Sequence, residues 1–367
     1  MLIDRLTARL KLAEQENAKR QIRVRHGVDF ASNDYLGFSQ REELKRAAKA
    51  TIDSHGVGGR ASHLVMGHTQ HHELLSQQAA ELFGYEAAMV FSSGYAANLG
   101  IIATLLTKGD RVLHDRLNHA SLLDGGALSG ANFRRFRHND VAQLRDFLSR
   151  SNEPTLVAIE SVYSMDGDVA DLVEIQAACQ EFGATLLVDD AHGVGVIGHH
   201  GRGASTAIKP DILMVACGKA LGSYGALVCG SKELIAGLSN FSRTYVYTTA
   251  LPPAQAAASS AALALLQAND SAIATLQSNI AHFRYCAEDS GLLLSASHSA
   301  IQPIHVGDNT RLMNLAEHLE AKGFLVGAIR APTVAKGSER LRISLSAAHT
   351  PAQIEQLISE VRRSDLI

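Results

Sequence analysis

The stretch TLLVDDAHGVGVIG, residues 185–198, indicates the fold class most directly, because an apolar run ends abruptly in two carboxylates and a histidine. Short apolar, β-branched runs of this kind are typical of strands that are buried on both faces. Similar runs recur along the chain, separated by segments with helical spacing, at 87–91, 111–115, 155–160, 212–216 and 226–230. The alternation predicts an α/β fold with a largely parallel sheet and helices on both faces.

Polar, chemically able residues follow four of these runs. They are 92–95 after the run at 87–91, 161–166 after the run at 155–160, 189–192 at the end of the run that begins at 185, and Lys219 after the run at 212–216. In open α/β sheets, ligands bind outside the carboxyl ends of the strands. We therefore expect a functional site at this edge of the sheet.

The chain is expected to have three parts. Residues 1–37 form an N-terminal helical segment, in which charges alternate with leucines at helical spacing. Residues 38–267 form a large α/β domain, and 268–367 form a smaller α+β domain with strands expected at 299–307 and 340–347. The N-terminal segment has no sheet partner of its own, and we expect it to pack on the smaller domain.

Composition excludes several classes of function. The formal net charge is −3 with interspersed signs, so no basic face is available for nucleic acid. The most apolar long stretch, 250–268, contains Gln and Ser and is too short for a clean membrane span, which predicts a buried or subunit-facing helix. The N-terminus lacks the apolar core and cleavage site of a signal peptide. We expect a cytoplasmic protein without nucleic-acid or membrane partners.

Cysteine and histidine spacing gives no indication of a metal site or a disulfide. The four cysteines form no CxxC pair and lie in apolar or helical surroundings, as thiols in a reducing compartment usually do. No acid or thiol set completes a coordination shell around the histidines at 68, 71, 72, 199 and 200. No metal is expected.

Lys219 follows a buried-strand pattern in ILMVACGKALGSYG and lies between glycines that permit a sharp turn. A lysine in a partly desolvated site loses some preference for its charged form, so its amine becomes available for Schiff-base chemistry. A surface lysine in a loop is the simpler explanation of this residue when it is considered alone.

The carboxylate of Asp189 needs a cationic partner if it is buried. The protonated pyridine nitrogen of pyridoxal phosphate is such a partner. Alternatively, Asp189 could cap the next helix or bind Mg²⁺. The absence of GxxxxGK[ST] disfavours a nucleotide site.

Two further groups of residues suit a phosphate and a carboxylate. Residues 92–98 lead from a strand into a helical pattern, which places free backbone amides where a phosphate could bind. Arg330 precedes a turn and Arg342 lies in a strand pattern, and either guanidinium could bind an α-carboxylate through two hydrogen bonds. Ordinary strand-to-helix turns and solvent-facing arginines look similar.

Taken in order, a series of motifs resembles the α-oxoamine synthases, a branch of the fold-type-I pyridoxal-phosphate enzymes. The resemblance extends from SNDYLG at 32–37 to LSAAH at 345–349. It rests on SSGYAAN at 92–98, DRLNHASL at 115–122, ESVYSMDGD at 160–168, VDDAHGVGVIG at 188–198 and GKALG at 218–222. It implies an aspartate-aminotransferase-like fold with a mostly parallel seven-stranded sheet in the large domain, pyridoxal 5'-phosphate (PLP) as cofactor, and a homodimer with sites at the interface.

The resemblance also implies roles for individual residues. Lys219 would form the Schiff base with the cofactor, Asp189 would pair with the pyridine nitrogen, and Ser164 and His192 would contact the ring-oxygen side. Lys219, Asp189 and His119 would be the catalytic residues.

Gly94 and Tyr95 would lie near the cofactor's phosphate, and His119 would stack over its ring and orient the substrate. The remaining substrate-binding residues would be Arg20, Asn33, Arg330 and Thr333.

Two departures from the family pattern stand out. Ala216 replaces the threonine that usually lies three residues before the Schiff-base lysine and binds the phosphate. A lost hydrogen bond to a charged group costs about 1.5–3 kcal/mol if nothing replaces it. Thr248 or Thr249 of a partner subunit would be a replacement. The usual Pro-Pro of a substrate-binding turn is Ala331-Pro332.

The segments at 299–309, 328–334 and 242–258 are similar to the family branch that condenses L-alanine with a pimeloyl thioester, carried by CoA or acyl-carrier protein, in biotin synthesis. In that reaction Lys219 would remove the α-proton of alanine, and CO₂ and the free thiol would leave. The alternatives are another α-oxoamine synthase such as glycine C-acetyltransferase, a nicotinamide-dependent oxidoreductase, which the missing GxGxxG disfavours, and a non-catalytic partner subunit.

Overall fold

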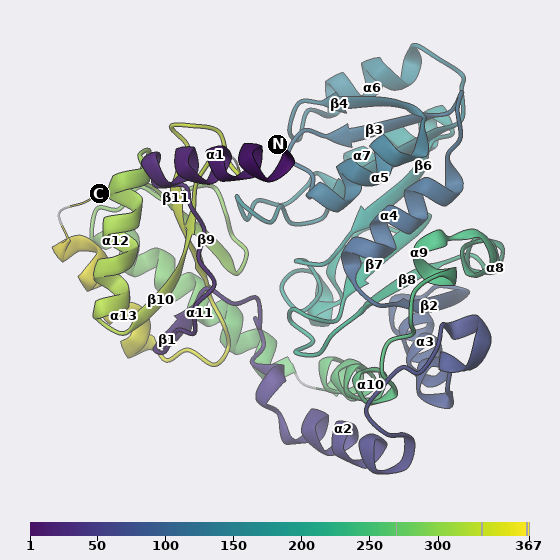
Figure 1. Ribbon diagram of the computed structural model, residues 1–367, viewed down its shortest axis with the longest axis horizontal. Coiled ribbons are helices and arrows are strands. Elements are labelled where there is room, and N and C mark those ends of the chain that lie inside the picture. The colour runs from purple at the N-terminus through teal and green to yellow at the C-terminus, as the bar shows by residue number, and fades with distance from the viewer. Residues whose placement is uncertain (269, 332, 365, 367) are drawn as a thin grey trace. The chain divides into compact units, whose positions relative to one another are not determined.

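The computed structural model of the chain (Figure 1) describes residues 1–268, 270–331, 333–364 and 366. Contacts between Cα atoms divide the chain into two compact units. Unit 1 comprises Met1–Asn33, Met165–Gly167 and Thr275–Ile367, and unit 2 comprises Asp34–Ser164 and Asp168–Ala274. The expected large domain ran without interruption from 38 to 267, whereas residues 165–167 belong to unit 1 through contacts such as the hydrogen bond from Ser297 Oγ to the Gly167 carbonyl (2.9 Å).

The sheet of unit 2 has seven strands, as expected, and six of them run parallel. Only β8 runs against its two neighbours, β2 and β7. The strands in spatial order are β2 (Ala87–Phe91), β8 (Ala226–Gly230), β7 (Ile212–Ala216), β6 (Thr185–Asp189), β5 (Thr155–Glu160), β3 (Arg111–Asp115) and β4 (Asn132–Phe136). The fold class predicted from the sequence is confirmed. β6 and β5 are adjacent and in register at Glu160 and Asp189, which brings their last residues side by side.

The edge strand β4 was not predicted. Its sequence NFRRF has two arginines, and only Phe136 is buried. An edge strand needs to bury one face at most, so its sequence need not show the continuous apolar run that identifies β5 or β7.

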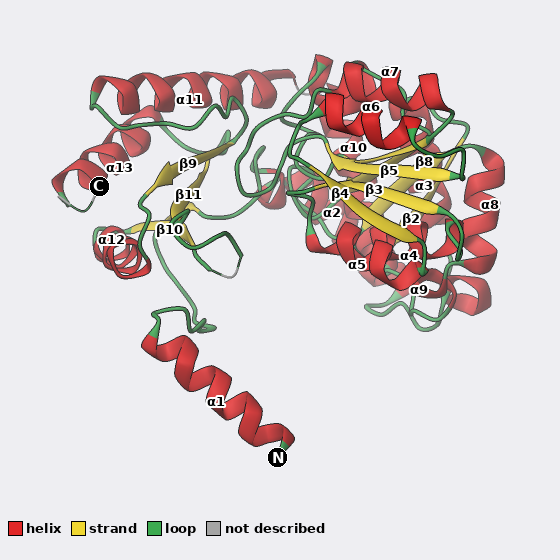
Figure 2. Ribbon diagram, turned by 90° about the horizontal axis from the view of Figure 1, so that it is seen from above, coloured by secondary structure: helices red, strands yellow, loops and turns green. Residues whose placement is uncertain are grey.

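Helices cover both faces of this sheet. Figure 2 shows α6 (Val141–Ser149) and α7 (Leu172–Phe182) on one face and α4 (Gly94–Leu105) and α5 (Ala120–Ser129) on the other. The remaining helical segments of unit 2 are η1 (Phe38–Gln40), α2 (Glu42–His55), η2 (His63–Gly67), α3 (Gln70–Phe83), η3 (His199–Gly201), η4 (Gly203–Thr206), α8 (Lys232–Phe241), α9 (Arg243–Val246) and α10 (Pro253–Ala268). Apolar side chains of α4 and of the central strands form the core, including Ile101, Ile102, Val112, Leu156 and Met214.

The alanine-rich stretch predicted as a helix is α10. It packs on α2 and α3, and its buried residues include Ala256, Ser259, Ala262 and Leu266. Small side chains allow this close helix packing. Within the part of the chain that the structure describes, no helix is long and apolar enough to cross a membrane.

Unit 1 contains a four-stranded sheet in the order β1 (Val28–Phe30), β10 (Phe324–Ile329), β11 (Arg340–Ser344) and β9 (Ile301–His305). Its helices are α1 (Leu2–Gln15), α12 (Asn309–Ala321), α13 (Pro351–Arg363) and most of α11 (Asp270–Asp289). The two strands expected in this region, β9 and β11, are present. β1 and β10 were not predicted, because three-residue β1 is too short for a periodic pattern and Gly327 interrupts the apolar run of β10.

The N-terminal helix α1 buries none of its residues. Leu6, Leu10 and Leu12 are each about half exposed, and Figure 2 shows α1 apart from the other helices of unit 1. The contacts to unit 1 are made by the segment that follows the helix, for example from Asn17 Nδ2 to Thr310 Oγ1 (3.0 Å). Residues 1–33 group with unit 1, and the packing of α1 itself on this domain stays a prediction.

A buried carboxylate organises the loop after β6. Asp190 is fully buried and accepts hydrogen bonds from Ser161 Oγ (2.5 Å) and from the backbone amide of Ala204 (2.8 Å). Burial raises the pKa of Asp190 to about 7. Gly203 (φ +65°) lies directly against this carboxylate, because a Cβ built there would be 2.0 Å from Oδ2. The loop can close around Asp190 only with glycine at this position.

We predict that Gly203→Ala destabilises the protein more than Gly183→Ala does. Gly183 has the same φ of +65°, but a Cβ added there would meet no atom within 4 Å, so its substitution costs only backbone strain, about 1–2 kcal/mol. The clash with Asp190 adds roughly 1–3 kcal/mol in Gly203→Ala. Chemical denaturation of both variants measures the difference, and equal losses would contradict the packing argument.

Candidate active site

Lys219 is half-buried in the tight turn that links β7 to β8. The turn is closed by hydrogen bonds from the Gly222 amide to the Lys219 carbonyl (2.8 Å) and from the Cys217 amide to the Gly225 carbonyl (2.9 Å). Gly222 has φ +61°, and a Cβ there would be 2.2 Å from the backbone nitrogen of Ser39. The turn therefore fixes the lysine backbone at the carboxyl end of β7.

Asp189 is the last residue of β6, and its side chain is buried. Its Oδ2 accepts a hydrogen bond from Asn98 Nδ2 (2.7 Å), and its Oδ1 accepts one from the Ala191 amide (3.0 Å). Asn98 is completely buried on α4 and also donates to Ser121 Oγ (2.9 Å) on α5. The carboxylate is thus held in one orientation by groups from three elements.

His192 follows Asp189 by three residues, and its side chain is buried. Its Nδ1 shares a hydrogen bond with the hydroxyl of Tyr35 (2.7 Å). Tyr35 is itself completely buried, in the SNDYLG motif. A rigid phenol therefore fixes the plane of the imidazole.

Glu160 ends β5, beside Asp189 on β6. Its side chain is buried, and Oε2 accepts a hydrogen bond from the Ser164 amide (3.3 Å) while Oε1 has no partner among the described residues. Burial raises the pKa of Glu160 to about 8, and the negative charge of Asp189 adds to this, while Lys219 and the amides of His119 and Ser164 oppose it. An unpaired buried carboxyl oxygen at a strand end is unusual and indicates a site built for another group.

His119 caps α5, where its Nδ1 accepts from the Ser121 amide (3.3 Å) and lies 2.8 Å from Ser121 Oγ. Its surface is accessible, yet the surrounding protein lowers the pKa of its imidazole, a shift that Lys219 reinforces and Asp189 opposes. Tyr95 meets His119 edge-on, with ring centroids 6.3 Å apart, and hydrogen-bonds through its hydroxyl to Asp124. A neutral ring held in this way has an open face for stacking.

The start of α4 is arranged to receive an anion. Ser93 Oγ caps the helix by accepting from the Ala96 amide (3.1 Å), and the Ser93 carbonyl accepts from the Ala97 amide (3.0 Å). The amides of Gly94 and Tyr95 have no acceptor among the described residues, as is usual in a first helical turn. These amides and the helix dipole favour a phosphate.

Seven of the predicted residues therefore lie at the carboxyl-edge turns of the unit 2 sheet: Gly94, Tyr95, His119, Ser164, Asp189, His192 and Lys219. The charges of Asp189 and Lys219 both act on His119 and on Glu160, so these four side chains share one electrostatic environment. A capped helix start for a phosphate, a fixed buried carboxylate for a pyridinium and a lysine at the neighbouring strand end fit PLP.

Ala216 ends β7 opposite Ala226 of β8 and is half-buried. It offers no hydroxyl to a phosphate. Thr249 forms an isolated β-bridge with Ser62 within unit 2, and Thr248 lines a surface cavity with Tyr247. Compensation by either threonine across a dimer interface stays a prediction.

Apart from His119, the substrate residues predicted from the sequence lie in unit 1. Arg20 Nη2 donates to Thr333 Oγ1 (2.7 Å), and Arg330 Nη2 donates to the Lys19 carbonyl (2.8 Å). Arg20 and Arg330 line one cavity of about 610 Å³ together with Ala328. Burial lowers the pKa of Arg330, and the charge of Arg20 lowers it further, because the two positive guanidinium groups repel each other. Such a pair favours an anionic ligand.

Asn33 is the last residue of the first segment of unit 1. Its Oδ1 accepts hydrogen bonds from both terminal nitrogens of Arg342 (3.2 Å each), and Arg342 also donates to Ser344 Oγ (2.8 Å). Arg342 is buried. Of the two arginines considered from the sequence, Arg342 thus positions Asn33, while Arg330 lines the cavity. Pro332, in the turn that departs from the family pattern, lies outside the described residues.

Comparisons with known proteins show the family of the chain. Residues 25–361 match the family model described as aminotransferase class I and II. The chain is 48% identical to 8-amino-7-oxononanoate synthase of Cellvibrio japonicus over 335 residues, covering 90% of this chain and 84% of that protein. It is 47% identical to the enzyme of the same name from Pseudomonas aeruginosa, covering 91% of this chain and 85% of that protein.

The chain belongs to the 8-amino-7-oxononanoate synthase family. It is a PLP-dependent acyltransferase, as the sequence motifs predicted. Among solved structures, serine palmitoyltransferase from S. paucimobilis with a bound PLP–myriocin adduct has a TM-score of 0.92 at 29% identity, covering 98% of this chain and 96% of that one. The Francisella tularensis 8-amino-7-oxononanoate synthase has a TM-score of 0.81 at 31% identity, covering 92% and 98%.

Sequence reasoning missed three site residues of this 8-amino-7-oxononanoate synthase family member: Asn98, Glu160 and Tyr35. Asn98 could have been found from the sequence, because its polar side chain lies in the apolar helix GYAANLGIIATL. A polar residue in such a helix must find a buried partner, and here the partner is Asp189. Glu160 and Tyr35 lie within motifs that were identified, but only the sheet register and the chain path bring them to Asp189 and His192.

The cofactor-free protein should lose stability as the pH rises from about 4.5 to about 8. The raised pKa of Glu160 means that the folded chain binds a proton that the unfolded chain has already released in this range. The free energy of unfolding therefore falls by at most about 1.4 kcal/mol per pH unit from this group. Denaturation across this range should show a shallower slope in Glu160→Gln.

Asp190 also lowers the free energy of unfolding as the pH rises to about 7. The test is therefore the difference in slope between wild type and Glu160→Gln, and not the wild-type slope alone. Identical pH profiles of wild type and Glu160→Gln would contradict a protonated Glu160.

Proposed function

We propose that this chain condenses L-alanine with a pimeloyl thioester, releasing CO₂ and the free thiol carrier, to give 8-amino-7-oxononanoate. The observation that carries the proposal is the buried Asp189 carboxylate, fixed by Asn98 at the end of β6, beside the strand that leads into Lys219. The names of the closely similar relatives support the same reaction.

PLP, when bound, supplies a conjugated ring that takes up the electron pair left on the α-carbon of the amino acid. Asp189 would hold the pyridine nitrogen protonated, and Asn98 keeps its carboxylate aligned for that contact. The Nζ of Lys219 would accept the α-proton and later return a proton to the product. Glu160 would face the site as a neutral acid at neutral pH, so that it adds no second negative charge next to Asp189.

Binding and orientation would fall to the other residues. The amides of Gly94 and Tyr95 would bind the phosphate, and Ser164 and His192 would contact the ring oxygen. His119 would cover the ring and orient the substrate, in the position that Tyr95 and Ser121 give it.

The anionic ends of the substrates would meet the arginines of unit 1. Arg330 and Thr333 would contact the amino-acid and acyl substrates, and Arg20 would contact the acyl substrate. The repulsion between Arg20 and Arg330 in one cavity would be relieved by a bound carboxylate. Asn33, held by Arg342, would lie near the substrate.

The assembly and setting follow from the same proposal. We propose a cytoplasmic homodimer whose sites lie at the subunit interface and whose donor is pimeloyl-CoA or pimeloyl-acyl-carrier protein, with no nucleic-acid or membrane partner.

The purified protein should be yellow, and borohydride should bleach the colour and fix the cofactor covalently to Lys219. Peptide mass mapping would locate the adduct. In Lys219→Ala the cofactor should bind without a reducible linkage and wash out on dialysis. A colourless wild-type protein that stays colourless with added PLP would contradict the proposal.

Substrate choice is a separate question. With pimeloyl-CoA, release of the CoA thiol should depend on alanine, and glycine with acetyl-CoA should give little turnover. The reverse preference would assign the chain to glycine C-acetyltransferase chemistry while leaving the cofactor site intact.

Ala216→Thr should tighten PLP binding. A restored hydroxyl near the phosphate contributes about 1.5–3 kcal/mol, or roughly a tenfold to hundredfold fall in Kd. Ala216→Val adds the same volume without the hydroxyl and is the matched control. If both variants bind PLP as the wild type does, another group already satisfies the phosphate.

A further inference from the structure

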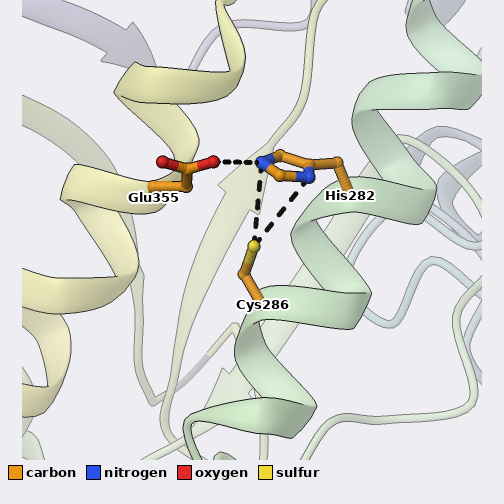
Figure 3. A group of neighbouring side chains, drawn as sticks. All are labelled: His282, Cys286 and Glu355. Atoms are coloured by element: carbon orange, nitrogen blue, oxygen red, sulfur yellow. Dashed lines mark hydrogen bonds and ion pairs between the residues drawn. The ribbon is translucent and has the colours of Figure 1, made fainter.

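A cluster of metal-ligating side chains lies between α11 and α13 in unit 1 (Figure 3). His282 and Cys286 are one helical turn apart on α11, so both project from the same face. Glu355 reaches them from α13. None of the three has a role in the proposed reaction.

The distances converge on one atom, His282 Nε2. The Glu355 Oε1 atom is 3.0 Å from it and the Cys286 Sγ atom is 3.7 Å from it, and all candidate ligand atoms lie within 4.8 Å of one another. A tetrahedral Zn²⁺ with usual bond lengths separates N from S by roughly 3.6 Å and N from O by roughly 3.4 Å. The two separations from Nε2 are thus within a few tenths of an ångström of those that a bound ion would give.

The imidazole ring is the part that must adjust. Cys286 Sγ is also 3.9 Å from Nδ1, so the sulfur lies over the ring face, as Figure 3 shows. Rotation about the Cβ–Cγ bond of His282 would turn Nε2 toward the sulfur. The side chain is 29% exposed and can rotate without disturbing a core.

The site is open to ions from solution. A surface cavity of about 570 Å³ is lined by Cys286, Glu355 and Asp289. Asp289 lies three residues after Cys286 on α11 and would supply a fourth ligand after a rotamer change, or water would take that position. A thiolate and one carboxylate neutralise a divalent ion, and Arg362, which lines the same cavity, offsets the charge of Asp289.

The ligand chemistry selects the kind of metal. Mg²⁺ and Ca²⁺ prefer all-oxygen sites, whereas a thiolate, an imidazole and a carboxylate suit Zn²⁺ and its spectroscopic substitute Co²⁺. Cys179, Cys217 and Cys229 are buried, whereas Cys286 is half-buried and accessible.

We propose that His282, Cys286 and Glu355 form a binding site for a Zn²⁺-class divalent transition metal that links α11 to α13. This departs from the expectation of no metal. The sequence did not reveal the site because Glu355 is far along the chain from the other two ligands, and only the packing of the two helices brings them together.

The test is titration of the untagged holoenzyme with Co²⁺. The expected result is one equivalent of tightly bound cobalt, with d–d absorption bands at wavelengths longer than the cofactor's colour, and displacement by Zn²⁺. His282→Ala, Cys286→Ala and Glu355→Gln should each weaken binding at least about tenfold, since the loss of even an outer-sphere partner does so. His298→Ala and Glu288→Gln, which change exposed residues of the same unit, are the matched controls.

Two further measurements keep the test independent of folding defects and of catalysis. Zn²⁺ should protect Cys286 of the unaltered protein from alkylation by iodoacetamide, located by mass spectrometry. Zn²⁺ should also raise the Tm in a concentration-dependent way, because metal that binds only the folded state stabilises it. Unchanged alkylation of Cys286 at saturating metal would overturn the proposal. Cobalt binding that persists in both His282→Ala and Cys286→Ala would also overturn it.

Discussion

The burial of three carboxyl groups at one edge of a sheet is the constraint on which the rest of unit 2 depends. Glu160 and Asp189 end the adjacent strands β5 and β6, and Asp190 follows directly after β6, where water cannot solvate these buried side chains. Each ionised carboxylate would cost several kcal/mol there without compensation. The neighbouring elements are shaped by the need to supply that compensation.

The three acids are treated differently. Asp190 is satisfied within the fold by Ser161 and the Ala204 amide, so its role is structural. Asp189 has an amide donor on each oxygen and keeps its orientation, as a partner for a cationic ring nitrogen must. Glu160 has one oxygen without a partner among the described residues, and its raised pKa keeps it neutral. Asp189 therefore remains to face a cofactor, and Lys219 shares its environment.

Unit 1 uses the opposite charge for the same physical reason. Arg342 is buried and donates to the neutral amide of Asn33, which orders that side chain. Arg20 and Arg330 line a common cavity, and the charge of Arg20 lowers the preference of Arg330 for its charged state. The two arginines donate to a threonine hydroxyl and a backbone carbonyl, and the cavity that they line would suit a carboxylate-bearing substrate. Away from these residues, two neighbouring helices bring His282, Cys286 and Glu355 close to one another.

The sequence by itself determined the fold class, and it predicted which residues would gather at the carboxyl edge of the sheet. Continuous apolar runs identify the buried strands, and polar residues directly after them must gather at one edge of a parallel sheet, so Asp189, His192 and Lys219 could be predicted together. The motifs extended this to Gly94, His119 and Ser164. The tertiary structure alone decided the contacts between residues far apart in the chain: Asn98 with Asp189, Tyr35 with His192, Asn33 with Arg342, and Glu355 with His282. Local sequence patterns report which face of an element is buried, but not which element lies against it. Edge strand β4 and short strand β1 were missed for that reason, because their stability comes from a neighbouring strand and not from their own residues.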